Sequence, residues 1–304
     1  MDFKIISSDY GMLLFESGIL LKVLLEENGL ASTTEIMAGM GFSPWNYLVS
    51  LESSSRLEES VVGVVNPTES TFRIIGGASF PRELLLRMKV SIHSAALHPN
   101  TLNCWVGSSK SVLCCYDWAS NQNTQTEKIL ISREYKSDVL AVACDKQVVY
   151  AGLRNGIVGL VDAHRSHVPA VSFQSSQSPT SSLVPFAHSD SQLLVGHLDG
   201  TINLFDLRFL SLSHSKKTAT LPLKTFKCKN NIKKFECTLV DDSIVACCSD
   251  LGQLNAWNLD TGNLVSNLTW HTNVGVEKRG ILAWQAGPAF RAWLVDEEKV
   301  CALS

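Results

Sequence analysis

Short apolar stretches separated by polar, glycine-containing turns recur along the chain. In each clear copy a strand ends at a small residue, a turn follows, and a second strand with alternating apolar residues is closed by Asp or Asn. The distance from the small residue to the closing residue is ten positions in every copy. The four copies run from Gly107 to Asp117, from Gly152 to Asp162, from Gly196 to Asp206 and from Cys248 to Asn258. A constant spacing of this kind predicts a repeat built from β-hairpins.

Fainter hairpins flank these four copies, and the predicted strand ends fall near residues 24, 75, 117, 162, 206, 258 and 294. Seven hairpins in 304 residues correspond to about 43 residues per unit, within the roughly 40–45 typical of WD40 repeats. A single small sheet cannot bury both of its faces alone, so the units are expected to stack radially. We therefore predict an all-β, seven-bladed WD40 β-propeller with degenerate repeats. Each hairpin taken alone would also fit an ordinary meander.

The whole chain, residues 1–304, is predicted to be one propeller domain. Residues 25–60 are expected to form an irregular long loop between blades one and two, because they contain a Ser/Thr cluster and several glycines. The polar, low-complexity residues 174–182 are expected to be a mobile loop between strands. Strands from both chain ends should complete one blade, so Phe3 to Ser7 should pair near the C-terminal strands.

Composition limits the classes of partner. Hydrophobic residues make up 45% of the chain, and the net charge of −3 gives no general attraction for nucleic acid or an anionic membrane. Nine cysteines in no regular spacing are typical of reduced thiols, which predicts an intracellular protein of the nucleus or cytoplasm. We expect no binding to a membrane.

Lysines concentrate in the segment from Lys216 to Lys234. The segment fits a solvated loop at the rim of the propeller. It also fits a patch that binds an acidic partner or nucleic acid, or that directs nuclear import.

The sequence shows no catalytic, cofactor or metal motif. It contains no phosphate-binding Gly-rich loop, no His-Glu-x-x-His and no cysteine pair with zinc spacing. The eight histidines are dispersed and are interpreted as turn or rim residues. We therefore expect no enzyme activity, no cofactor and no metal.

The repeats resemble degenerate WD40 repeats, with Phe205-Asp206 and Trp257-Asn258 standing where the family has Trp-Asp. The hairpin from Asp199 to Asp206, followed by Arg208, is similar to the extended WD box. The order of features over residues 90–300 resembles the WD-repeat-21-like, cullin-4-associated substrate receptors.

This resemblance implies docking to the adaptor subunit of cullin-4 ubiquitin ligases. The residues implied to bind the adaptor are Asp199, Asp206, Arg208 and Arg165. Arg165 stands one residue later than the family's second box places its arginine. Alternatively, Arg208 pairs with an acidic residue of a neighbouring blade.

The expected function is a non-catalytic substrate-recognition subunit that holds the adaptor on one face and an unknown protein target on the opposite rim. The alternative is a generic WD40 scaffold in a nuclear, RNA-related or chromatin-related complex with no ligase connection.

Overall fold

The computed structural model describes most of the predicted strands and the turns that join many of them. The described residues are 2–5, 10–14, 20–26, 29–37, 47–51, 61–66, 70–76, 82–87, 90–97, 103–109, 112–117, 132–145, 147–162, 171–186, 189–210, 220–228, 236–240, 243–248, 253–269, 281–285, 291–296 and 299–303. Contacts divide the chain into two compact units, each treated separately below. Unit 1 comprises Met1–Ser91 and Trp270–Ser304, and unit 2 comprises Ile92–Thr269.

Unit 1 contains three antiparallel sheets among its described residues. The first sheet is formed by β1 (Asp2–Ile5), β2 (Tyr10–Leu14), β3 (Leu20–Glu26) and β4 (Gly29–Met37). The second is formed by β5 (Tyr47–Leu51), β6 (Val61–Asn66), β7 (Thr71–Gly76) and β8 (Arg82–Arg87). The third has only β25 (Ile281–Gln285), β26 (Arg291–Asp296) and β27 (Lys299–Leu303).

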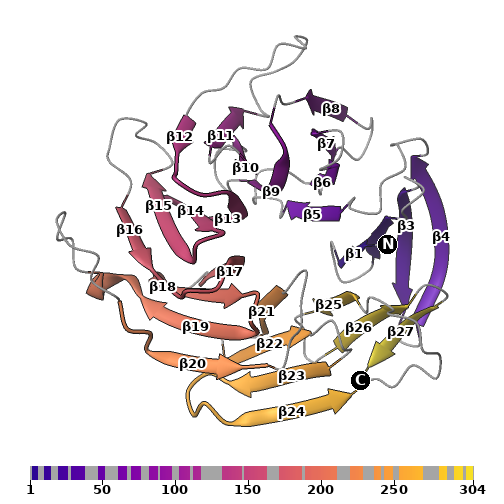
Figure 1. Ribbon diagram of the computed structural model, residues 1–304. Helices are drawn as coiled ribbons and strands as arrows, with labels where there is room; N and C mark the ends of the chain where they lie inside the picture. The colour runs from indigo at the N-terminus through magenta and orange to yellow at the C-terminus, as the bar shows by residue number, and fades with distance from the viewer. Residues whose placement is uncertain are drawn as a thin grey trace. The chain divides into compact units, whose positions relative to one another are not determined.

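Unit 2 contains four sheets of four antiparallel strands, each a meander of consecutive strands (Figure 1). They are β9 (Ile92–Leu97), β10 (Asn103–Ser108), β11 (Val112–Asp117) and β12 (Ser132–Glu134); β13 (Val139–Cys144), β14 (Val148–Leu153), β15 (Ile157–Asp162) and β16 (Val171–Gln174); β17 (Thr180–Phe186), β18 (Ser189–His197), β19 (Thr201–Asp206) and β20 (Lys224–Lys227); and β21 (Glu236–Val240), β22 (Ile244–Cys248), β23 (Gln253–Asn258) and β24 (Leu264–Thr269). The one helix among the described residues is the 3₁₀ turn η1 (Leu207–Phe209). It lacks the length that a membrane-spanning helix would need.

The hairpin pattern predicted these strands well. The strands β3, β7, β11, β15, β19, β23 and β26 end at residues 26, 76, 117, 162, 206, 258 and 296, each within two residues of the predicted end. The all-β fold is confirmed, and the described strands form seven sheets. The number of blades in the complete propeller stays a prediction, as does the assignment of residues 1–304 to one domain.

Three local expectations are wrong. Residues 25–60 are not an irregular loop throughout, because β4 and β5 lie within them and β3 ends inside their first two positions. Residues 180–182 begin β17 instead of extending a mobile loop. β1 lies beside β25 but pairs with β2, so strands from the two chain ends do not combine into one sheet among the described pairings.

The turns of unit 2 show why glycine is needed in the pattern. Gly156 and Gly200 have φ angles of 75° and 79°, a left-handed conformation that disfavours other residues. Gly156 is also enclosed, because a Cβ atom there would lie 2.7 Å from the Ser178 carbonyl oxygen of the following segment. These two glycines fix the turns that hold β15 and β19 against their preceding strands.

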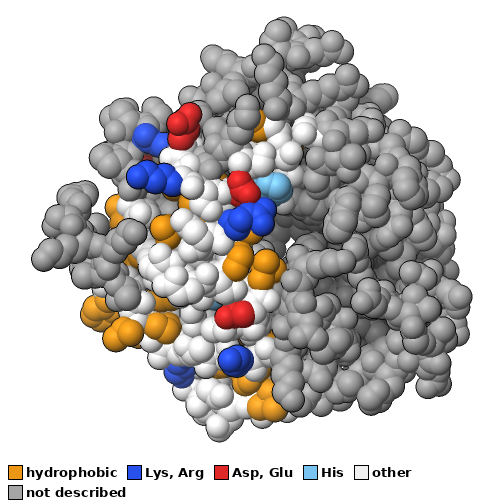
Figure 2. Space-filling view, in the orientation of Figure 1, with side chains coloured by type: hydrophobic (Ala, Val, Ile, Leu, Met, Phe, Trp, Pro, Cys, Tyr) orange, Lys and Arg blue, Asp and Glu red, His pale blue; other side chains and the backbone are white. Residues whose placement is uncertain are grey.

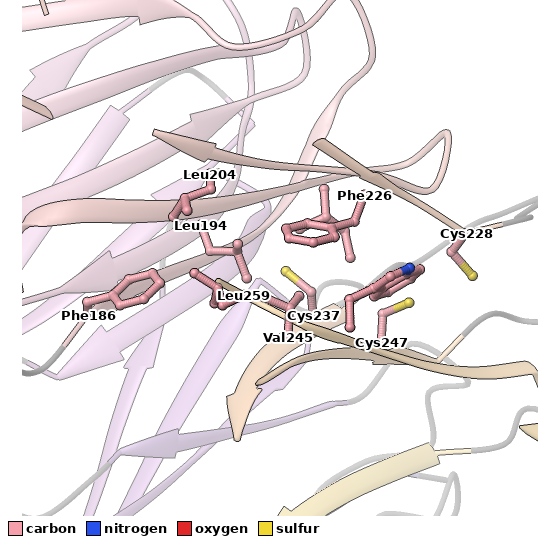
Figure 3. Packing of buried hydrophobic residues seen from close by; sticks show 11 residues of the cluster. Phe186, Leu194, Leu204, Phe226, Cys228, Cys237, Val245, Cys247 and Leu259 are labelled. Carbon is pink, nitrogen blue, oxygen red and sulfur yellow. The ribbon is translucent and has the colours of Figure 1, made fainter. Parts of the chain in front are cut away.

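Apolar side chains fill the space between neighbouring sheets of unit 2. Phe205 of β19 is completely buried and meets Phe173 of β16 edge-on, with ring centroids 4.9 Å apart. Trp257 of β23 packs against Phe226 of β20, with centroids 5.6 Å apart. The second contact belongs to a cluster of aliphatic, aromatic and cysteine side chains (Figure 3). Phe205 and Trp257, which precede the closing residues Asp206 and Asn258, therefore both pack between sheets.

Candidate functional site

Arg208 is positioned by the end of β19. The strand stops at Asp206, which has extended backbone angles and caps η1. The Asp206 Oδ1 atom accepts a hydrogen bond of 3.0 Å from the Arg208 backbone N–H. Aspartate is favoured at such a cap because its carboxylate accepts an otherwise unsatisfied backbone donor. The turn thus directs the chain away from the sheet directly after Asp206.

The side chains of Asp206 and Arg208 form a two-pronged ion pair. Arg208 Nη2 lies 2.6 Å from Asp206 Oδ2, and Arg208 Nε lies 3.0 Å from Asp206 Oδ1. The Asp206 side chain is only 4% exposed, whereas that of Arg208 is 70% exposed. A buried carboxylate therefore anchors an exposed guanidinium, and this geometry strongly restricts where the guanidinium points.

The ion pair stabilises the charged forms of both groups. The hydrogen bonds from the Arg208 side chain lower the pKa of Asp206 below its usual value. The same interaction raises the pKa of Arg208.

One edge of the Arg208 guanidinium is occupied by Asp206. The other edge, formed by Nη1 and the second Nη2 proton, faces away from Asp206. That outer edge offers parallel donors to an acceptor on another molecule.

Among the residues that the structure describes, Arg208 does not pair with an acidic residue of a neighbouring blade. Its acidic partner lies two residues earlier in the same segment. The pairing leaves Arg208 exposed, so it does not remove the residue from contact with a partner.

Asp199 has the turn role that the pattern predicts. Its Oδ1 atom accepts a 3.0 Å hydrogen bond from the Thr201 backbone N–H, and its own N–H donates to Ser178 Oγ at 3.2 Å. The structure does not bring Asp199 together with Arg208. Asp199 precedes β19 and Arg208 follows it, and a strand of this length separates its ends by about 17 Å.

The remaining predicted residues contribute little to a common site. Arg165 lies outside the described residues, and Asp162 marks the end of β15 before it. Most of the Lys216–Lys234 segment also lies outside them. Lys224 is described, and its Nζ atom donates to the Leu259 carbonyl at 2.5 Å and to that of Asp260. This lysine therefore ties β20 to the turn after β23.

Two features at the opposite end of β19 were not predicted. Asp138 and Arg154 form an ion pair of 2.8 Å where β13 begins and β14 ends, next to the turn between β14 and β15, with 28% and 56% of their side chains exposed. His197 is completely buried, which corrects its interpretation as a turn or rim residue. Burial lowers its pKa to about 4, although Asp199 and the backbone of Ser178 act in the opposite direction.

Apolar residues around Arg208 were also missed. Phe209, Leu221 and Leu223 are each more than half exposed. The sequence offers a signal for Phe209, which directly follows the predicted arginine, whereas Leu221 and Leu223 lie in the lysine-containing segment that was predicted to be a solvated loop or a charged patch. The described residues contain no group of acidic, His and Cys side chains arranged to hold a metal ion. The arrangement suits molecular contact through Arg208 and its neighbours.

Comparison with known proteins gives information about the fold. No family model matches the sequence, and no curated protein matches it. The crystal structure of Raptor from Chaetomium thermophilum is similar over 99% of this chain, with a TM-score of 0.73 and 13% identity, and the chain spans 28% of that protein. The crystal structure of the WD40 β-propeller domain of Doa1 is similar over 99% of this chain and 90% of its own, with a TM-score of 0.68 and 12% identity. The chain therefore has the fold of a WD40 β-propeller.

Proposed function

We propose that this protein is a non-catalytic recognition subunit of a cullin-4 ubiquitin ligase that docks to the adaptor subunit through Arg208. The observation that carries the proposal is the exposed guanidinium held by the buried Asp206 carboxylate. Arginine is a favoured anchor in protein interfaces, and a guanidinium held in advance loses less conformational freedom on binding. The sequence resemblance to cullin-4-associated receptors supplies the class of partner.

The end of unit 2 that carries Asp138 and Arg154 supports the proposal that the protein also recognises a target. It lies at the other end of the strands from Arg208, so a target bound there would not compete with the adaptor. In this proposal the protein joins two partners in the nucleus or cytoplasm.

The test is co-precipitation of the purified adaptor with the wild-type chain and three variants. Arg208→Ala should weaken binding roughly thirtyfold, as expected for an interface anchor worth about 2 kcal/mol. Arg208→Lys should not restore binding, because a lysine cannot pair with Asp206 and also present a planar fork. Arg154→Ala is the matched control, since Arg154 is also an exposed arginine paired with an aspartate, and binding should be unchanged.

The result also distinguishes the alternative function. A wild-type chain that does not bind the adaptor would favour a WD40 scaffold without a ligase connection. Equal losses for Arg154→Ala and Arg208→Ala would show that the loss is not specific to Arg208 and would overturn its assignment as the docking residue.

A further inference from the structure

Three exposed apolar side chains lie close to Arg208 along the chain and across the sheet. Phe209 directly follows Arg208 in η1. The Leu223 backbone N–H donates a 2.7 Å hydrogen bond to the Leu204 carbonyl, which places Leu223 beside the end of β19, with Leu221 two residues earlier. We call these three side chains, Phe209, Leu221 and Leu223, the apolar rim. Hydrophobic side chains gather at the left of the described surface in Figure 2.

The apolar rim is unusual for unit 2. Among the described residues, only five large hydrophobic side chains are more than about half exposed, and three of them form this rim. The other two are Leu264 and Val265 on β24 of the next sheet. Single exposed apolar residues are common on protein surfaces, but clustered ones mark contact sites.

The charged groups described at this place already have partners within the chain. The buried Asp206 carboxylate neutralises Arg208, and the Lys224 ammonium donates to two main-chain carbonyls. A carboxylate arriving at the outer edge of the guanidinium would also experience repulsion from Asp206. A neutral carbonyl oxygen accepts the same hydrogen bonds with a smaller desolvation cost.

We infer that the adaptor surface that meets Arg208 is apolar and uncharged, with main-chain carbonyl oxygens that receive the guanidinium and apolar side chains that cover the rim. This inference rests on the proposed function and specifies the chemistry of the partner. It adds apolar burial by the rim to the hydrogen bonds that Arg208 contributes to binding. Contacts of this kind are weakly affected by salt, whereas complementary charges are screened by it.

The experiment measures the Kd of the full chain for the purified adaptor by titration. The double variant Leu221→Ser/Leu223→Ser should bind at least about tenfold more weakly. The matched control Leu264→Ser/Val265→Ser removes two equally exposed apolar side chains from the next sheet and should change the Kd by less than about twofold. For the wild type, raising NaCl from about 0.05 M to about 0.5 M should change the Kd by less than about threefold.

Each outcome has a separate meaning. Binding that is lost with Arg208→Ala but ignores the rim variant, or that weakens at least about tenfold with salt, overturns this inference and leaves the proposed function intact. A wild-type chain that binds no adaptor at any salt concentration overturns both. If the wild type self-associates in sedimentation and the rim variant is monomeric, the rim is covered by a second copy, and the inference is wrong.

Discussion

Two aspartate–arginine pairs lie at opposite ends of the strands of unit 2, and they are built differently. Asp206 and Arg208 are two residues apart, joined through two nitrogens of the guanidinium, and the carboxylate also caps the backbone of η1. Asp138 and Arg154 are sixteen residues apart and share one side-chain contact, with both groups partly exposed. The first pair holds an arginine in a fixed direction. The second joins the residue before β13 to the residue after β14, where the Arg154 backbone N–H also donates to the Asp138 carbonyl at 2.9 Å, and it holds the Arg154 guanidinium through Nε alone.

The comparison has a consequence for binding at each end. At one end, the exposed Phe209 follows Arg208 in η1, and the exposed Leu223 lies beside the end of β19. A partner that contacts Arg208 can therefore also bury apolar side chains. At the other end, Arg154 lies in a turn beside the exposed polar residue Asn155, so a partner there meets polar groups of that turn.

The largest expected effect concerns β19, the strand that leads to Arg208. Phe205→Ala should lower the free energy of unfolding by about 3–5 kcal/mol, because it removes a buried ring and its contact with Phe173. Phe209→Ala is the matched control and should change stability by less than about 0.5 kcal/mol, because Phe209 is exposed. Urea unfolding of both variants measures the difference. Similar midpoints for the two would contradict the strand register described here.

A smaller effect is expected from pH at the opposite end of β19. The buried His197 has a pKa lowered from 6.5 to about 4, so the folded state resists its protonation more than the unfolded state. The stabilisation is complete above pH 6.5 and is lost as pH falls toward 4, by about 3 kcal/mol for a pKa change of this size. His197→Gln should therefore show a shallower loss of stability over this range. The measurement is the urea midpoint of each protein from pH 7 to pH 4, and parallel curves would refute the prediction.

Removing the carboxylates compares the two ion pairs directly. Asp206→Asn should destabilise the protein more than Asp138→Asn, because it replaces a buried carboxylate, both oxygens of which accept from Arg208, with an amide that has one acceptor and places an NH2 group near the guanidinium. It should also weaken adaptor binding while Arg208 is still present. Thermal melts and the adaptor titration measure the two effects. A larger loss from Asp138→Asn would reverse our assessment of which pair is the more rigid.

The smallest effect is expected for the exposed pair. Arg154→Ala should change the free energy of unfolding by less than about 0.5 kcal/mol, because partly exposed ion pairs contribute little. Chemical denaturation at low and high salt checks this value. A loss of 2 kcal/mol or more would show that the link between the two loops is structurally important.

Features set by neighbouring residues were predictable from the sequence. Gly200, Asp199 and Asp206 act through turns and hydrogen bonds within a few positions of themselves, so their spacing was sufficient to place the strands around them. The strand β4 was missed because its Ser and Thr residues are typical of both loops and strands. Whether such a segment is a strand depends on its partner β3, which the local pattern does not contain.

Features set by distant contacts were not predictable. The burial of His197 and the bonding of Lys224 to carbonyls about 35 residues later depend on how sheets pack. The apolar rim was missed for a different reason. Leu221 and Leu223 lie within the Lys216–Lys234 segment, whose lysines predicted a solvated loop or a charged patch, so its leucines were not recognised as an exposed apolar surface.

The serine-rich segment after β16 affects which substitutions the chain can tolerate. Its contacts to the Gly156 turn use main-chain carbonyls of Ser176 and Ser178, and the side chains of Gln174 and Ser175 bond to backbone oxygens. The packing against Gly156 therefore uses the backbone of this segment, and any residue larger than glycine at position 156 would collide with it. The Ser176 and Ser178 hydroxyls have a separate role, because they accept hydrogen bonds from the backbone N–H groups of Ser178 and Asp199. The segment therefore has low sequence complexity but a defined backbone path. The residue that constrains this path is Gly156, about 20 residues earlier in the chain.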